Sequence, residues 1–338
     1  MPLASLTIAA ALSLVLSREP APASAAGADA AVLSDAAGGE TAAVRRLARD
    51  LPGFQIRTGR RFVLLSDLPP EEAAATLAQL EATADAVELF AKSLAIEARP
   101  IDRRLISVGF SDRAAFEQFA QDVDRLDASW MAGYWMPGAD RTVFRCGSQS
   151  GSQSGLPSES PSKDAPQQGI LATTLTHESG TVAHEAAHQL LHRLGVQRRS
   201  PNGPLWLSEG LAMAFEGCAS GDSRPFSLPY GRRDDRSRQL RDLAAQGHVP
   251  PLAALVATPR LLSRDVSEIK GFYLASWSLA KFLSESDPSA FAAYLASLRA
   301  EASGLSAKRN VEIFVASFGE IDAVAARWRR AAMERSTR

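Results

Sequence analysis

The sequence has almost no net charge to offer a charged partner. Its 338 residues include 37 Lys and Arg against 38 Asp and Glu, which gives a formal net charge of −1. Proteins that bind nucleic acid or an anionic membrane by charge carry a basic excess. Proteins that bind single strands also interleave basic with aromatic residues, and no stretch of this chain does so. We therefore expect no nucleic acid among its partners.

Cysteine is scarce as well, with only Cys146 and Cys218 in the chain. In an oxidising compartment the two thiols could form a disulfide. The alternative is a pair of unrelated buried thiols, which are common in protein cores. The sequence leaves both open, because it does not fix the distance between the two Cα atoms.

An uncharged apolar run occupies residues 3–16, and small residues at 23–26 offer a cleavage site. The run is too short to span a bilayer, and no cysteine at its end offers a lipid anchor. This pattern predicts a signal peptide over residues 1–25, export to the periplasm or the extracellular space, and no stable membrane span after signal removal. No Lys or Arg precedes the run, so a disordered tail or an uncleaved anchor stays open.

The rest of the chain divides by composition. Residues 26–53 are rich in Ala, Gly and Asp and predict a flexible lead-in. Residues 54–335 predict a single domain. Within it, residues 147–168 are mostly Ser, Gln, Gly and Pro with almost nothing to bury, which is typical of a disordered surface insertion.

Apolar patterning predicts the fold class. Strands are expected at 61–66 and 104–110, a hairpin at 131–136 and 141–146 around a Pro-Gly turn, and an extended run at 170–175. Helices are expected at 70–96, 112–123, 180–194, 204–216, 232–246, 271–285, 287–301 and 307–334. A mixed sheet first and a mostly helical second half indicate an α+β architecture.

The strongest chemical signal is His184-Glu185-Ala186-Ala187-His188. Two histidines four residues apart on a helix face the same side, so both imidazoles can reach one Zn²⁺. Glu185 lies around the helix from them and can accept a proton from a zinc-bound water that attacks the substrate. The pattern alone also occurs in helices that bind no metal.

A catalytic zinc needs a third protein ligand. His192 lies about 12 Å along the helix from His184 at 1.5 Å per residue, and we interpret it as a helix-end residue favoured by the dipole. Leu191 and Leu194 occupy the places where a metzincin has its Gly and third His. Glu209 is the better candidate, on a second helix where Gly210 and Ala212 allow close approach to the first. An exposed helical glutamate is the alternative.

The segments TVAHEAAH (181–188) and WLSEGLA (206–212) together resemble the gluzincin metallopeptidases, the thermolysin-like zincins, and are most similar to a bacterial, often exported branch of them. The resemblance extends over about residues 130–285. It implies a zincin-like fold, zinc held by His184, His188 and Glu209, catalysis by Glu185, and a peptide or protein as substrate.

Other residues carry weaker indications. Tyr273, in a Tyr-x-x-Ser-Trp stretch that resembles a helix of the same branch, could donate to an oxyanion or simply pack with its hydroxyl at the surface. Glu216 could fix the tautomer of a zinc histidine or be a solvated helix end. His177 could contact substrate or cap a loop. The charged run at 232–238 predicts a solvated helix face.

These residues predict a zinc-dependent hydrolase that cleaves peptide bonds. The alternatives are a non-catalytic zincin-fold protein of the cell envelope, which binds or scaffolds, and a purely structural zinc site. Binding alone does not need the intact Glu185, and structural zinc sites are usually closed and rich in cysteine.

Overall fold

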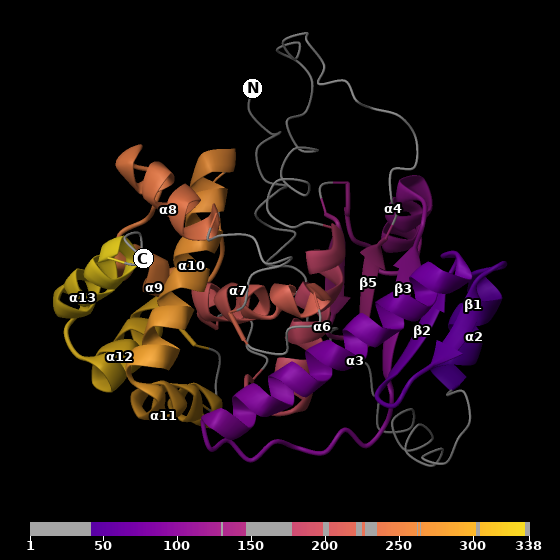
Figure 1. Ribbon diagram of the computed structural model, residues 1–338, viewed down its shortest axis with the longest axis horizontal. Coiled ribbons are helices and arrows are strands. Elements are labelled where there is room, and N and C mark those ends of the chain that lie inside the picture. The colour runs from indigo at the N-terminus through magenta and orange to yellow at the C-terminus, as the bar shows by residue number, and fades with distance from the viewer. Residues whose placement is uncertain are drawn as a thin grey trace, which may run out of the picture.

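The computed structural model describes residues 42–129, 131–146, 178–198, 203–220, 225–226, 235–261, 263, 265–301 and 305–334. The predicted signal peptide, the insertion at 147–168, the extended run at 170–175 and His177 lie outside these residues. The described part is α+β, with a five-stranded sheet first and a mostly helical second half. Figure 1 shows the sheet on one side, helices α8 to α13 on the other, and α6 and α7 between them.

The sheet has the order β1-β2-β3-β5-β4. The three central strands are parallel, and an antiparallel strand lies at each edge. The predicted hairpin is confirmed as the pair β4 and β5, with Gly133 opposite Phe144. The bounds are Gln55–Thr58 for β1, Phe62–Ser66 for β2, Leu105–Phe110 for β3, Gly133–Met136 for β4 and Arg141–Arg145 for β5.

Both faces of the sheet are covered, so β2 is buried along its whole length. Alternate residues of a strand point to opposite faces, and Phe62 and Leu64 accordingly join one core while Val63 and Leu65 join another. The first core lies against α3 (Pro70–Ser93) and α6 (Glu178–Arg193). The second lies against α2 (Ala42–Asp50) and α4 (Arg113–Asp122).

The prediction of a flexible lead-in up to residue 53 is wrong at its end. Residues 42–50 form the helix α2, whose Val44 and Leu47 are buried against the sheet. The short strand β1 then pairs with β2. Val44 and Leu47 are only two apolar side chains one helical turn apart, among many small residues. They are therefore too few to predict a core-facing helix from the sequence.

The helical half contains more elements than predicted. Its helices are α7 (Leu205–Ala214), the 3₁₀ helix η1 (Glu216–Ser220), α8 (Asp235–Ala245), α9 (Leu252–Ala257), α10 (Val266–Ser286), α11 (Pro288–Ala300), α12 (Ala307–Phe318) and α13 (Ile321–Glu334). The single helix expected over 307–334 is wrong. Gly319 has a φ of 89° and ends α12, a backbone conformation that favours glycine.

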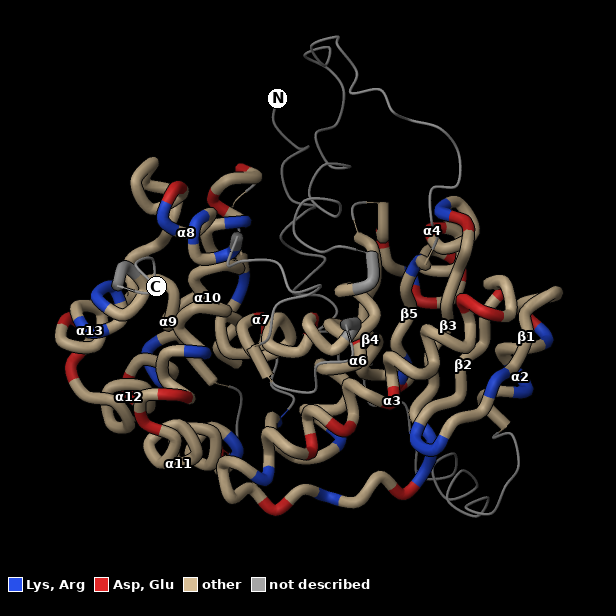
Figure 2. The backbone as a smooth tube through the Cα atoms, viewed as in Figure 1, with Lys and Arg blue, Asp and Glu red and all other residues tan. Residues whose placement is uncertain are grey.

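Helix α7 packs closely on α10. A Cβ at Gly210 would lie 2.4 Å from the carbonyl oxygen of Ser276, so only glycine fits there. The sequence predicts that Gly210 faces the histidine helix, whereas in the structure it contacts α10. Figure 2 shows charged residues spread over both halves, whereas α7 carries a single charge, that of Glu209.

No helix among the described residues combines the length and the apolar character that crossing a membrane requires.

Candidate metal centre

Helix α6 lies on the sheet and carries the His-Glu-x-x-His segment. Its buried side chains face the first core, namely Val182, Ala186, Ala187, Leu190 and Leu191. His184 is 7% exposed and His188 is half-buried. The two rings lie on the same side of the helix, with centroids 4.9 Å apart. The predicted spacing therefore gives two imidazoles beside each other.

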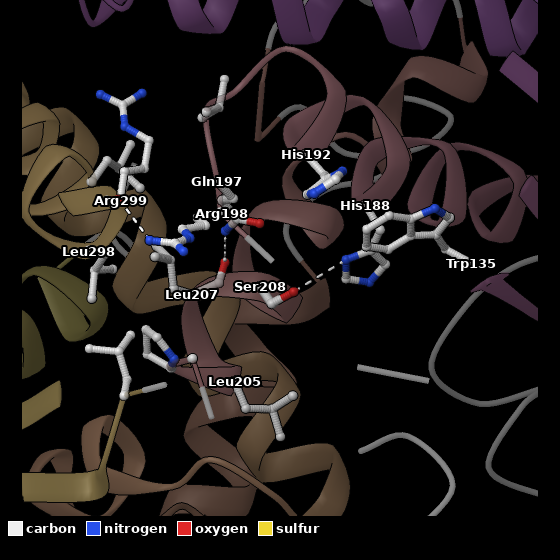
Figure 3. Close-up of a pocket in the computed structure, with 15 residues that line it drawn as sticks. Trp135, His188, His192, Gln197, Arg198, Leu205, Leu207, Ser208, Leu298 and Arg299 are labelled. Atoms are coloured by element: carbon white, nitrogen blue, oxygen red, sulfur yellow. Dashed lines mark hydrogen bonds between the residues drawn. The ribbon is translucent and has the colours of Figure 1, made fainter. Parts of the chain in front are cut away.

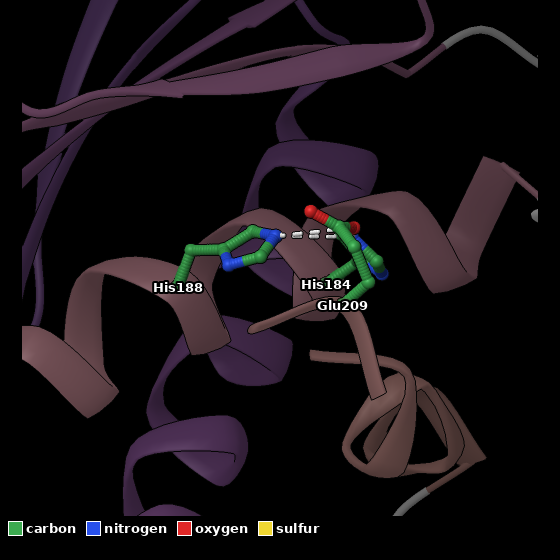
Figure 4. A group of neighbouring side chains, drawn as sticks. All are labelled: His184, His188 and Glu209. Atoms are coloured by element: carbon green, nitrogen blue, oxygen red, sulfur yellow. Dashed lines mark hydrogen bonds and ion pairs between the residues drawn. The ribbon is translucent and has the colours of Figure 1, made fainter. Parts of the chain in front are cut away.

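Helix α7 brings Glu209, which is 3% exposed, to these imidazoles. The two Nε2 atoms of the histidines are 3.2 Å apart, and Oε2 of Glu209 lies 3.4 Å from that of His184 and 3.7 Å from that of His188 (Figure 4). Ligands at about 2.0–2.1 Å from a tetrahedral ion lie about 3.3 Å from one another. The three side chains are thus spaced to hold one metal ion.

Each imidazole is oriented by a second partner on its other nitrogen. Nδ1 of His184 is 2.9 Å from Oε1 of Glu216, and Nδ1 of His188 is 3.3 Å from Oγ of Ser208. A partner that accepts the Nδ1 proton leaves the lone pair on Nε2, the atom that faces the metal position. The sequence indicated Glu216 for such a contact but gave no sign of Ser208.

Glu216 reaches His184 by a different route from the one its spacing suggested. Helix α7 ends at Ala214, and Glu216 begins the 3₁₀ helix η1 rather than continuing the face that carries Glu209. Its second carboxylate oxygen, Oε2, is bound by Arg236, whose guanidinium also donates to the carbonyl oxygen of Met213.

The predicted solvated helix face is therefore wrong at Arg236. Its side chain is only 13% exposed, and its guanidinium lies 5.6 Å from the ring centroid of Trp277. The four arginines of the run look alike in sequence, and nothing local to them points to a partner twenty residues away. The chain His184–Glu216–Arg236 joins α6, η1 and α8.

Glu185 is half-buried and lies beneath the edge strand β4. A Cβ on Gly133 would lie 3.0 Å from Cγ of Glu185 and 2.8 Å from Cγ2 of Thr181. A backbone hydrogen bond from Trp135 reaches the Glu185 carboxylate. Strand β4 therefore approaches α6 at the residue with the expected catalytic role, and glycine at 133 makes the approach possible.

Burial and charge change the acidity of these groups in the absence of a metal. Burial by itself would raise the pKa of Glu209, but the charge of His188 and the hydrogen bonds with both histidines outweigh it and lower that pKa to about 2. Burial raises the pKa of Glu185, against the opposing effect of the two imidazoles. Burial would lower the pKa of His184, yet Glu209 and Glu216 raise it well above its usual value.

Tyr273 lies on α10, half-buried against the first core. Burial raises its pKa well above 10, and the negative charges of Glu209 and Glu185 raise it further. The phenol is thus near the carboxylates and keeps its proton across the physiological range. His192, in the last turn of α6, lies outside the ligand cluster, with its ring 5.3 Å from that of Trp135.

The two cysteines lie at the same core, and a disulfide between them stays a prediction. Cys218 is buried in the first core, and Cys146 is half-buried and packs against that core. A buried thiol behaves as a small apolar side chain, so neither position needs a bridge to be accommodated.

Residues 178–303 match a family described as a protein of unknown function, DUF1570. The match covers less than half of the chain, and it includes α6, α7 and α10, which carry His184, His188, Glu209 and Tyr273. A comparison with curated proteins finds no match. The fold and the cluster together resemble a zincin site with its His-Glu-x-x-His helix and a glutamate from a following helix.

Proposed function

We propose that this protein is a zinc-dependent hydrolase of the gluzincin type that cleaves peptide bonds. One observation carries the proposal: two imidazole nitrogens and one carboxylate oxygen lie 3.2–3.7 Å apart, with Glu185 beside them. Two nitrogens and one oxygen from the protein are the donor set of catalytic zinc sites of this kind, which leave one position open.

The chemistry follows from what each side chain can do. Zinc held there supplies a Lewis acid that polarises a carbonyl and acidifies water. Glu185, whose pKa is raised by burial, accepts the proton of the attacking water and passes it to the leaving amine, a role that works best near the operating pH. Tyr273, which keeps its proton, donates to the developing oxyanion.

A peptide is the substrate that the surroundings favour. Among the described strands, β4 lies at the edge of the sheet and passes directly over Glu185. An edge strand offers backbone N–H and C=O groups to an extended chain, which adds to the sheet by main-chain hydrogen bonds. A peptide bound in this way would lie along the site.

The test is to measure zinc content and peptide hydrolysis in the native chain, in Glu185→Gln, and in Glu320→Gln as a matched control on an exposed surface. We expect about one zinc per chain in all three, by analogy with single catalytic sites. Hydrolysis of a mixed peptide pool should fall by about 10²–10⁴-fold in Glu185→Gln only. A native protein without zinc contradicts the proposal. Zinc retained without hydrolysis by any form favours a non-catalytic binding or scaffold protein instead.

A further inference from the structure

A pocket with a cavity volume of about 70 Å³ opens next to the metal-ligand cluster (Figure 3). His188 and Ser208 form its end nearest the cluster, and the indole of Trp135 lines the same end. His188 belongs to both, so the pocket adjoins the metal position across this imidazole ring. No other part of the site so far described uses this space.

The middle of the pocket is apolar. Leu205 and Leu207 of α7 line it, and Leu295, Leu298 and Leu305 face them from the helical half. These leucines are between 1% and 9% exposed, so the wall is held by the core and does not collapse freely. A dry cavity of about 150 Å³ can hold benzene. A volume of 70 Å³ therefore suits a short aliphatic side chain and not an indole.

Two cations mark the far end of the pocket, Arg198 and Arg299. Nη1 of Arg299 donates to the carbonyl oxygen of Gly195 at 2.8 Å, and Arg198 donates to the carbonyl of Glu301. Among the described residues, no carboxylate forms an ion pair with either guanidinium. Each arginine has five N–H donors, so both keep donors that a carboxylate could accept.

The distance from the metal position to this end sets the length of a ligand. Gly195, the backbone partner of Arg299, follows His188 by seven residues along α6 and its cap, or about 10 Å at 1.5 Å per residue. An extended peptide advances about 3.3 Å per residue. A carboxylate two or three residues from the scissile bond would therefore reach the arginines.

We propose that this pocket is the subsite that selects the substrate: it binds a short aliphatic side chain next to the cleaved bond, while Arg198 and Arg299 bind a carboxylate two or three residues further along. The inference rests on the proposed function, since it assumes that a peptide bound at the metal continues into the pocket. The carboxylate can belong to an acidic side chain or to the carboxyl end of the peptide. The peptide probes described next distinguish these two sources.

The test uses peptide hydroxamates, which chelate the metal themselves, and the zinc-loaded full chain with Glu185→Gln, which should not cleave them. In the first pair, the hydroxamate is at the carboxyl end of acetyl-Xaa-Ala-Val. In the second pair, it is attached at the amino end of Val-Ala-Xaa amide. Xaa is Glu in one member of each pair and Gln in the other. A fifth probe, with Gln and a free terminal carboxylate, reports on the chain end. Dissociation constants are measured by isothermal titration calorimetry.

We expect the Glu probe of one pair, or the free-acid probe, to bind about tenfold more tightly than its uncharged counterpart, as a partly exposed charge-assisted contact allows. Arg198→Gln and Arg299→Gln should each reduce this advantage. Arg327→Gln is the matched control, because Arg327 also donates to a backbone carbonyl, that of Phe318, and does not line the pocket. Replacing Val by Trp in the probe should weaken binding about tenfold or more.

The outcomes separate the two proposals. If the hydroxamates bind but the charged and uncharged probes bind equally well, the subsite is wrong and the zinc site stands. If Trp is accepted as well as Val, the aliphatic part is wrong. If no hydroxamate binds to the zinc-loaded protein, the proposed function fails and the subsite fails with it. Zinc content and the thermal unfolding midpoint of each variant show whether it has folded.

Discussion

The two histidines of the candidate metal centre have different surroundings. His184 is buried, and its Nδ1 faces a carboxylate, Glu216, that is itself bound by Arg236. His188 is half-buried, its Nδ1 faces the neutral hydroxyl of Ser208, and its ring lines the pocket. One side of the centre is fixed by a charged network inside the protein. The other side forms part of the surface that a ligand would touch.

This difference suggests a division of work between the two sides. A buried carboxylate that accepts from an imidazole makes the other nitrogen a better metal ligand, so the His184 side should dominate metal affinity. Loss of the weaker, neutral partner of His188 should reduce metal affinity less. Substitutions on that side should therefore affect substrate binding more than metal binding.

The largest expected effect is loss of a ligand. His184→Ala and His188→Ala should each weaken zinc binding by more than about 100-fold, because a lost ligand should cost more than the loss of its outer partner. The rise in the thermal unfolding midpoint on adding zinc should disappear with it. Zinc titration with a competing chelator measures the zinc affinity of both variants. Affinity close to the native value in either one would show that this histidine is not a ligand.

The next largest effect on zinc affinity is expected from Glu216 and Ser208, the side chains that contact Nδ1 of the two histidines. Glu216→Gln should lower zinc affinity by about 10–100-fold, while Ser208→Ala should lower it by about fivefold, the value of one neutral hydrogen bond. The same chelator competition gives both numbers. Equal losses in the two variants would mean that the two sides of the centre contribute alike.

Strand β4 provides a test of the Glu185 position that does not touch a ligand. Gly133→Ala places a methyl group 2.8–3.0 Å from Thr181 and Glu185, and we expect the rate of hydrolysis to fall about tenfold while zinc is kept, since small displacements of a catalytic group are costly. Gly138→Ala, in the turn after β4 and with nothing within 4 Å of the added Cβ, is the control. If both variants keep the native rate, β4 does not position Glu185.

The smallest expected effect concerns the metal-free protein and pH. The pKa of His184 is raised by Glu209 and Glu216, against the effect of burial. Its protonated form therefore stabilises the fold fully below the unfolded-state pKa of about 6.5, and this stability is lost as the pH rises through the folded-state pKa. The unfolding midpoint of the chelator-treated protein should fall by a few degrees between pH 6 and pH 9. Glu216→Gln should flatten this slope, and an unchanged slope in that variant would contradict the assignment.

The part of this arrangement that the sequence predicts is the part encoded at short range. His184 and His188 are related by one helical turn, and the strands β3 and β5 show as apolar runs, so these elements follow from local pattern. The prediction of Glu209 as the third ligand also depended on the apolar residues around it in the sequence.

Ser208 and Arg236 could not be predicted, because their contacts depend on how α7 and α8 pack against α6 and η1. Ser208 is one of many helical serines, and Arg236 stands in a run of four arginines and two aspartates. Glu216 meets His184 although the helix that was expected to carry it ends two residues earlier. Spacing identified the right partner there, but the chain reaches it by a change from α-helix to 3₁₀ helix.

The close contact of Gly210 with Ser276 also bears on how the molecule unfolds. Glu209 is joined through α7 to α10 in the helical half, whereas His184 and His188 belong to α6, which packs on the sheet. A metal ion bound by all three would therefore link the opening of one half to the opening of the other. Amide hydrogen exchange in α6 and α10 would slow together when zinc is added, and the two halves would then behave as one cooperative unit instead of two.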